Sequence, residues 1–235
     1  MKLLAFDTAT EACSVAIWDD GHVLERFEIA PRRHAEFALP WAEALLAEAG
    51  IARSQLDGIA VSRGPGAFTG VRLGIALAQG IALALDRPVS AVSTLAVLAV
   101  RAGAGNGEHV LAAIDARMGE IYSAGFVFDG DTPVPVIDER VGPPGAFELP
   151  DAPSAWHGVG TGFAAGEGEL LARLGGRWSQ VDAVALPRAG DLVRLAAARF
   201  ARGEATAPER VEPAYLRDNV ALTLVEQQAR RAARG

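Results

Sequence analysis

The order of strand and helix patterns along the chain constrains its fold more than any other feature. The chain opens on three apolar or alternating stretches that are typical of strands, with an Asp-Gly hairpin signal before the third: 3–7, 14–18 and 23–30. Helix and strand patterns then alternate, at 33–50, 56–62, 71–85, 89–92 and 94–102. Three antiparallel strands that lead into alternating helices and strands predict an α/β layer with a mixed sheet.

The second half of the chain repeats the opening of the first in a weaker form. A glycine cluster at 103–107 separates the halves, and strand patterns then return at 110–115, 120–128 and 134–137. Weaker patterns predict a further strand and two helices, at 155–159, 166–174 and 190–202. A duplicated α/β unit of this kind is the actin-like, sugar-kinase and heat-shock ATPase architecture, which is an RNase H-like fold. We therefore predict an N-terminal actin-like lobe, 1–105, and a degenerate C-terminal lobe with a helical tail, 106–235.

Charge and cysteine content exclude several classes of protein. Cys13 is the only cysteine, so neither an internal disulfide nor a cysteine-based zinc cluster can form. Lys2 is the only lysine, which excludes a Walker-type phosphate loop and an internal Schiff-base lysine. The formal net charge of −7 disfavours binding of duplex nucleic acid by this chain alone. The four histidines have no metal-ligand spacing, and we expect them in turns or on the surface.

Apolar stretches in the sequence are too short for a membrane helix. The longest uncharged and mostly apolar stretch, 73–85, falls short of the ~20 residues that a membrane span requires. Asp7 interrupts the first apolar run too early for a signal peptide. We therefore expect a soluble, cytoplasmic protein with no membrane contact.

A short polar turn, Asp7-Thr8-Ala9-Thr10, follows the first strand and is the first candidate site. A carboxylate at a strand end, followed by two hydroxyls, can hold a phosphate and position a metal-bound water. Asp and Thr are also common turn residues that bond to their own backbone, and the motif alone favours this structural interpretation. Asp115 ends the equivalent strand of the second half, but Arg117 and Met118 occupy the turn in which an ATPase of this architecture would place glycines.

The glycine-rich stretch 64–74 joins a predicted strand to a predicted helix. Its glycines permit close backbone approach, and the N-terminus of a helix can bind an anion. A tight strand-to-helix connection and a ligand site are equally compatible with this pattern. The helix that follows is apolar on nearly every side, with Arg72 and Gln79 as its only polar breaks, so a second subunit is expected to cover part of it.

Four segments carry a resemblance to a known family: 6–16, 63–74, 113–122 and 213–217. Together they closely resemble the TsaB (YeaZ) family, and the similarity spans nearly the whole chain. The glycine-rich block, 63–74, is the most specific of the four. The resemblance implies an actin-like fold in which Asp7, Thr8, Thr10 and Asp115 are at most a vestigial phosphate- or nucleotide-binding site.

The resemblance also implies a function. TsaB proteins are needed to make threonylcarbamoyladenosine in tRNA, at the adenosine 3′ of the anticodon. They pair with the transferase TsaD, which moves threonylcarbamoyl from its adenylate to the tRNA, and the ATPase TsaE completes the assembly. TsaD-like proteins bind metal through a histidine pair that this sequence lacks. This chain is therefore expected to be a non-catalytic subunit without cofactors of its own, with ATP or ADP and metal on the partners.

In this family the partner packs against two helices of the N-terminal lobe. Carried onto this chain, the predicted interface consists of Phe37, Trp41, Leu45, Phe68, Val71, Arg72, Ile75 and Gln79. The same face could pair two copies of the chain when the partner is absent. The alternatives are a stand-alone ATPase or kinase that uses Asp7 and Thr10 on phosphate, and a glycoprotease-like hydrolase.

Overall fold

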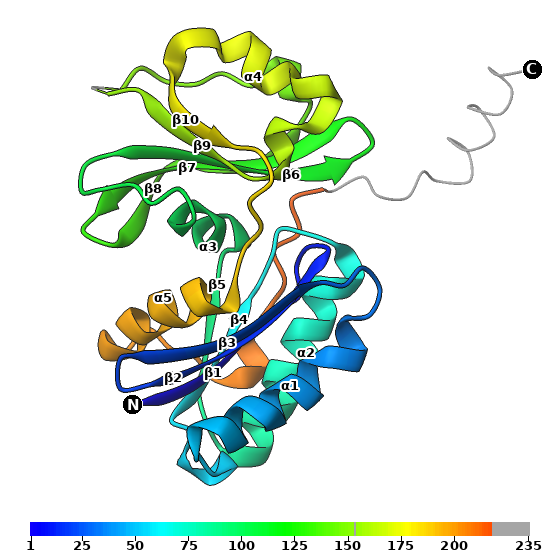
Figure 1. The fold of residues 1–235 in the computed structure, drawn as a ribbon, viewed down its shortest axis with the longest axis vertical. Coiled ribbons are helices and arrows are strands. Elements are labelled where there is room, and N and C mark those ends of the chain that lie inside the picture. The colour runs from blue at the N-terminus through cyan, green and yellow to red at the C-terminus, as the bar shows by residue number, and fades with distance from the viewer. Residues whose placement is uncertain (153, 218–235) are drawn as a thin grey trace, which may run out of the picture.

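Two lobes, each built on a five-stranded mixed sheet, make up the computed structural model, which describes residues 1–152 and 154–217 (Figure 1). The first sheet has the strand order β3-β2-β1-β4-β5. Its strands are β1 Lys2–Asp7, β2 Ala12–Asp19, β3 His22–Ile29, β4 Gly58–Ser62 and β5 Val89–Val92. β1, β2 and β3 form an antiparallel meander, whereas β4 and β5 run parallel to β1.

The second sheet repeats the first strand for strand. Its order is β10-β9-β6-β7-β8, with β6 His109–Arg117, β7 Glu120–Asp129, β8 Thr132–Gly142, β9 Trp156–Val159 and β10 Trp178–Asp182. β6, β7 and β8 are antiparallel, and β9 and β10 run parallel to β6. The predicted duplication is thus confirmed, and it extends to all five strands.

Helices cover both faces of the first sheet. α1, His34–Ala49, and α2, Phe68–Leu85, pack on one face against alternate residues of β1, β2 and β4. α5, Ala189–Ala201, covers the other face. Alternate strand residues point to opposite faces, so Leu4 and Phe6 meet α1 and α2 while Leu3 and Ala5 meet α5.

The last helix of each repeat packs on the sheet of the other lobe. α3, Thr94–Val100, follows β5 but buries Leu95 and Leu98 against the second sheet. α5 follows β10 but lies on the first sheet. The division of the chain into domains 1–105 and 106–235 stays a prediction, and α5 lies with the first sheet although it falls in the second range. The predicted helical tail beyond residue 217 lies outside the described residues.

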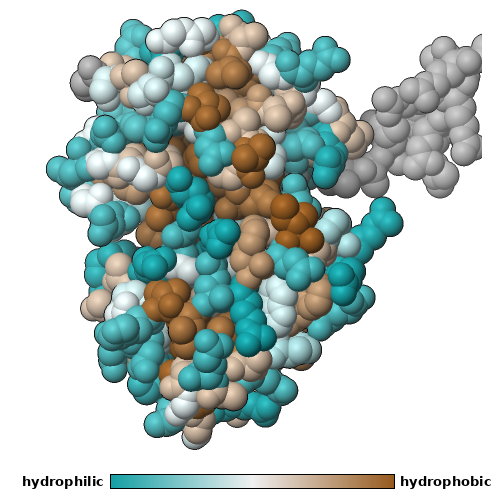
Figure 2. Space-filling view, viewed as in Figure 1, coloured by the Kyte–Doolittle hydropathy of each residue, from teal (hydrophilic) through white to brown (hydrophobic). Residues whose placement is uncertain are grey.

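The second lobe is degenerate in its helices. Where the first lobe has α1, the described residues between β8 and β9 form one 3₁₀ turn, Pro144–Ala146. The counterpart of α2 is α4, Glu169–Leu174, which is shorter than the helix predicted at 166–174 because Gly166 and Glu167 adopt positive φ angles of 57° each. On the face in Figure 2, apolar residues form several separate patches in both lobes and between them, and not one continuous surface.

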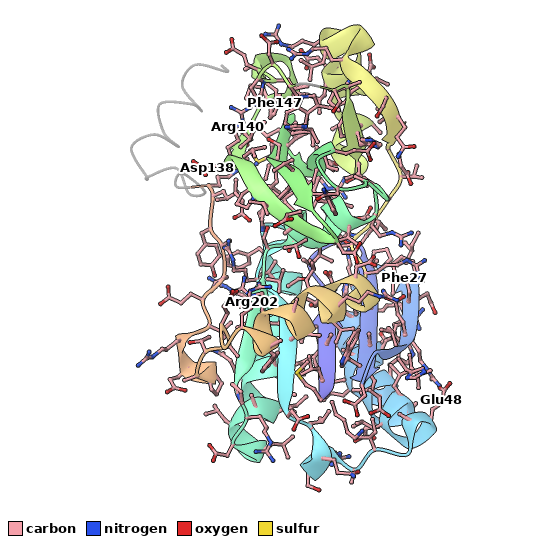
Figure 3. All side chains as sticks on the ribbon, turned by 90° about the vertical axis from the view of Figure 1, so that its left-hand side faces the viewer. Phe27, Glu48, Asp138, Arg140, Phe147 and Arg202 are labelled. Carbon is pink, nitrogen blue, oxygen red and sulfur yellow. The ribbon has the colours of Figure 1, made fainter. Side chains whose placement is uncertain are left out.

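The Glu25 side chain of β3 caps the N-terminus of α5, although the two are far apart in sequence. The Glu25 carboxylate accepts hydrogen bonds from Ser14 Oγ (2.9 Å) and Gly190 N (2.8 Å), and Ser14 Oγ in turn accepts one from Ala189 N (2.9 Å). The Arg188 guanidinium lies 3.3 Å from Glu25 and 4.0 Å above the ring of Phe27, which is labelled in Figure 3. Glu25 therefore satisfies a helix end that has no cap of its own.

Replacing Glu25 with alanine is expected to lower the free energy of unfolding by about 2 kcal/mol, because a buried backbone donor and a buried hydroxyl lose their partner. Urea denaturation followed by circular dichroism measures this change. Glu28→Ala is the matched control on the same strand. Glu28 is half-exposed and lies 4.0 Å from Arg33, so its loss should change stability by less than about 0.5 kcal/mol. Equal effects of the two substitutions would contradict the capping role.

Candidate functional site

The turn after β1 uses its polar groups within the chain. Asp7, Thr8 and Thr10 are all buried. Asp7 accepts hydrogen bonds from Ser62 Oγ and from Ala9 N (3.2 Å). The Thr8 hydroxyl donates to the carbonyl of Gly70 (2.7 Å), and Thr10 Oγ1 accepts from Ala12 N (3.3 Å). The geometry therefore agrees with the structural interpretation of this motif, in which its polar side chains bond to other groups of the same chain.

The glycine-rich stretch 64–74 packs directly onto that turn. A Cβ atom on Gly66 would lie 2.2 Å from the Ala9 carbonyl oxygen, and one on Gly70 would lie 2.0 Å from the Thr8 carbonyl oxygen. Ala67 N also donates to Ala9 O at 2.7 Å. The glycines thus allow the β4–α2 connection to fill the space above the turn. Between the two interpretations of this stretch, the geometry favours a tight strand-to-helix connection.

Burial changes the ionisation of Asp7. Desolvation raises its pKa from 3.8 to about 6, and the hydrogen bonds from Ser62 and Ala9 oppose the rise. His34, at the start of α1, is also buried, with Nε2 lying 2.9 Å from the Thr10 carbonyl and 3.2 Å from that of Ala12. The prediction that all four histidines lie in turns or on the surface is therefore wrong for His34, which joins α1 to the turn after β1.

Asp115 lies in the second sheet, apart from the first turn. Its carboxylate accepts from Arg117 N and from the Arg117 guanidinium, both at 2.8 Å, and its backbone N donates to Thr161 Oγ1 at 3.1 Å. Arg117 and Met118 both adopt left-handed conformations, with φ of 63° and 59°. Among the hydrogen bonds of the described residues, none joins Asp115 to Asp7, Thr8 or Thr10. Each of the two turns therefore uses its polar groups within its own lobe.

The predicted interface residues divide into a core set and a surface set. Leu45, Val71 and Ile75 are at most 6% exposed and belong to the core of the first lobe, which corrects their assignment as surface contacts. Phe37 and Trp41 are half-buried and stack on each other at 4.9 Å. Phe68, at the start of α2, is 58% exposed. The prediction of a contact surface therefore keeps the outer faces of α1 and α2 and loses the three core side chains.

α2 is an apolar helix of which only part is covered. By length and composition alone this helix could cross a membrane, with a mean hydropathy of 1.6 over 18 residues, although a third of that window is buried inside the protein. Core helices of globular proteins can pass the same test. Leu83, on the outer side, is 61% exposed, whereas Ala78 and Ala82 are fully buried against the sheet. The expectation of an apolar helix with one uncovered side thus fits the structure.

A C-terminal segment, which we call the strap (residues 206–217), joins the two lobes and was not predicted as a structural feature. Thr206 pairs with Val89 of β5, and Gln79 of α2 donates to the carbonyls of Pro208 (2.9 Å) and Val211 (3.2 Å). At its far end Arg217 donates to Ala116 O (3.2 Å) in the second lobe. Gln79 therefore holds the strap. The sequence pattern could not predict this segment, because it has no hydrophobic periodicity.

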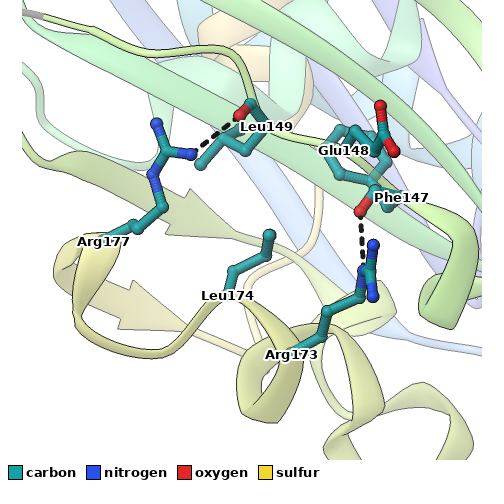
Figure 4. A pocket seen from close by; sticks show the side chains of 6 residues that line it. All are labelled: Phe147, Glu148, Leu149, Arg173, Leu174 and Arg177. Carbon is teal, nitrogen blue, oxygen red and sulfur yellow. Dashed lines mark hydrogen bonds between the residues drawn. The ribbon is translucent and has the colours of Figure 1, made fainter.

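One pocket of about 440 Å³ lies in the second lobe, away from every predicted site residue (Figure 4). It is lined by Phe147, Glu148, Leu149, Arg173, Leu174 and Arg177. Arg173 of α4 donates to the backbone carbonyl of Phe147 (3.0 Å), and Arg177, in the turn after α4, donates to that of Leu149 (2.9 Å). In the described part of the chain, no three His, Cys, Asp or Glu side chains are placed to hold a metal ion.

Comparison with known proteins gives matches over almost the entire chain. A family model described as TsaD, tRNA N6-adenosine threonylcarbamoyltransferase, matches residues 27–156. The "tRNA threonylcarbamoyladenosine biosynthesis protein TsaB" of Escherichia coli is 42% identical in an alignment that covers 94% of this chain and 96% of that protein. The protein of the same name from Haemophilus influenzae is 36% identical, with 94% and 95% covered.

A solved structure agrees with these sequence matches. YeaZ from Pseudomonas aeruginosa has a TM-score of 0.84 at 46% identity, and the match covers 92% of this chain and 99% of that one. These relatives therefore resemble this chain in length and sequence, and the solved structure also resembles it in fold. The chain belongs to the TsaB (YeaZ) family.

Proposed function

We propose that this chain is a non-catalytic subunit required for N6-threonylcarbamoyladenosine formation in tRNA, at the adenosine 3′ of the anticodon (position 37). In this proposal it pairs with a TsaD-like transferase and activates it, and a TsaE-like ATPase completes the assembly. The names of the E. coli and H. influenzae relatives support the pathway. The chain acts in the cytoplasm, where tRNA is modified, and ATP, ADP and metal belong to its partners.

The observation that carries the non-catalytic role is the filled turn after β1. The polar groups with which an actin-like ATPase would hold phosphate are buried in this chain, and Thr8 is bonded to Gly70. This geometry also weighs against the stand-alone ATPase or kinase, because Asp7 and Thr10 face other parts of the same chain. The uncovered side of α2 supplies the complementary argument, since a large exposed apolar surface on a folded protein usually marks a partner site.

Reconstitution of tRNA modification with and without this chain tests the proposal. We expect threonylcarbamoyladenosine to form when the transferase, the ATPase and this chain are all present, and to fall to background when this chain is left out. The isolated chain should hydrolyse no ATP. Full modification without the chain, or ATP turnover by the chain alone, would contradict the proposal.

The outer side of α2 offers a direct test of the pairing. Leu83→Asp is expected to weaken transferase binding at least about tenfold, because it places a charge in an apolar contact while leaving the core intact. Isothermal titration calorimetry with the purified transferase measures the affinity. Leu171→Asp on α4 is the control, since Leu171 is 41% exposed but lies in the other lobe. Val71→Asp or Ile75→Asp would instead bury a carboxylate in the core.

A further inference from the structure

Three of the exposed large apolar side chains lie along the strap although they are far apart in sequence. Phe68 starts α2, Met118 sits in the β6–β7 turn and Tyr215 belongs to the strap; they are 58%, 83% and 52% exposed. The rings of Phe68 and Tyr215 lie 6.3 Å apart. Arg217, two residues beyond Tyr215, brings its guanidinium 3.8 Å from the Met118 sulfur. These contacts place parts of both lobes on one edge of the molecule.

Arg72 lies between the two aromatic rings. Its guanidinium is 3.7 Å from the ring centre of Phe68 and 5.4 Å from that of Tyr215, and its Nε donates to the Tyr215 hydroxyl at 2.7 Å. We call this cluster the Phe68–Arg72–Tyr215 stack. The stack fixes the guanidinium plane in advance, so that little side-chain entropy remains to be lost when Arg72 binds a further group.

The charge of Arg72 has no acidic partner within residues 1–152 and 154–217, whereas nearby Arg63 pairs with Glu139 and Arg217 with Glu120. An exposed arginine between aromatic rings has the composition of a binding hot spot, because arginine and tyrosine dominate such sites. A planar guanidinium can give two Nη donors to a carboxylate in a two-point contact. Arg72 and its aromatic neighbours on this edge therefore suit an anion that has apolar groups beside it.

The turn that presents Met118 has an uncommon backbone conformation. Arg117 and Met118 both have positive φ, a conformation that ordinary residues seldom adopt in succession. Arg217 stabilises the turn through its bonds to Ala116 O and Glu120. Because the strap holds both the turn and the stack, a partner that contacts Met118 and Tyr215 together would fix the two lobes relative to each other.

We infer that the Phe68–Arg72–Tyr215 stack and Met118 form a contact surface for a protein partner that offers a carboxylate to Arg72 and apolar side chains to the flanking residues. The stack begins at the N-terminal end of α2, so it continues the apolar side on which the proposed transferase docks. The occupant is accordingly that transferase, and this inference rests on the pairing given under the proposed function. The new elements are the anchor at Arg72, its acidic counterpart and the contribution of the strap and the second lobe.

Calorimetric titration of the full-length chain with the purified TsaD-like transferase tests the surface. Arg72→Glu should weaken binding about 100-fold or more, and Tyr215→Ala and Met118→Asp about tenfold. Arg72→Gln should weaken binding less than Arg72→Glu does, because only the glutamate repels an opposing carboxylate. Arg202→Glu, on a half-exposed arginine at the end of α5 (Figure 3), and Val184→Asp, at a residue 81% exposed, are matched controls and should stay within about twofold.

The outcomes separate this inference from the proposed function. Unchanged transferase binding by Arg72→Glu and Tyr215→Ala, with melting curves like that of the wild type, overturns the contact surface alone. Equal weakening by Arg72→Gln and Arg72→Glu overturns the acidic counterpart. Normal transferase binding with weaker tRNA binding by the assembled complex would reassign the surface to RNA. If the unaltered chain fails to bind the transferase, both the pairing and this inference are wrong.

Discussion

Gly70→Ala is expected to destabilise the chain by about 3 kcal/mol or more, whereas Gly80→Ala, ten residues further along the same helix, is expected to stabilise it by about 0.5–1 kcal/mol. A Cβ atom at Gly70 would lie 2.0 Å from the Thr8 carbonyl oxygen, a backbone atom that cannot move aside as a side chain would. At Gly80 nothing lies within 4 Å, so the substitution removes only the entropic cost of a glycine in a helix.

Thermal and urea denaturation of the two variants measure the difference. Because both substitutions add one methyl group to α2, general effects on helix propensity favour alanine at each position and cannot produce opposite signs. If Gly70→Ala is insoluble while Gly80→Ala folds, the close approach at Gly70 is also supported. A Gly70→Ala variant as stable as the wild type would show that the glycine-rich connection does not fill the space above the turn.

The sequence pattern was sufficient for the elements of the first lobe. The strand at 3–7 and the helix at 33–50 correspond to β1 and α1, and Gly50 ends α1 in a left-handed conformation, with φ 66°. Local periodicity works there because each element buries one consistent side. β8 runs from Thr132 to Gly142, well beyond the predicted 134–137, because an edge strand tolerates Pro133 and Pro135.

Elements and contacts that depend on tertiary structure were harder to predict. β10, Trp178–Asp182, was missed because its residues neither alternate nor form an apolar run. The exchange of α3 and α5 between the lobes has no local signal, since either helix could cover either sheet. Hydropathy also cannot tell which side of an all-apolar helix meets its own sheet, and this is why Val71 and Ile75 were assigned to a partner although they are core residues.

The candidate site in the turn after β1 also depends on tertiary contacts that the sequence pattern does not reveal. The residue types at 7–10 suit both phosphate binding and a bonded turn, and although the motif alone favours the turn, the backbone that lies above them decides between the two. The glycines at 66 and 70 carried a usable signal, because two glycines at a strand-to-helix connection indicate that another backbone passes close by. The sequence could not say that this backbone is the Asp7–Thr10 turn itself.

Asp7→Asn is expected to raise the free energy of unfolding by about 3 kcal/mol at pH 7 and to change it little near pH 4. Burial raises the pKa of Asp7 from 3.8 to about 6 in the folded chain, so the folded state holds a proton that the unfolded state has released between these values. The stability contributed by Asp7 is therefore complete below about pH 4 and is lost as the pH rises through about 6. The change in the pKa of Asp7 from 3.8 to about 6 corresponds to about 3 kcal/mol.

Asparagine can occupy the same place without leaving a polar atom unpaired. Its carbonyl oxygen can accept from Ala9 N, as one carboxylate oxygen does now, and its amide can donate to Ser62 Oγ. Urea denaturation of the wild type and Asp7→Asn between pH 4 and pH 8 should give stabilities that agree at the acidic end and separate as the pH rises. Asp129→Asn, at the exposed end of β7, is the control and should follow the wild type throughout.

Asp7 thus reduces stability at neutral pH, and the geometry does not support a binding role for it. The Asp7→Asn substitution distinguishes a structural from a functional role of this carboxylate. If Asp7 only completes a buried turn, Asp7→Asn should form the complex with the transferase and support tRNA modification at the wild-type rate, while being more stable. If modification is lost although the variant folds and binds the transferase, the carboxylate takes part in the reaction of the assembled complex. That result would contradict the non-catalytic role that the filled turn supports.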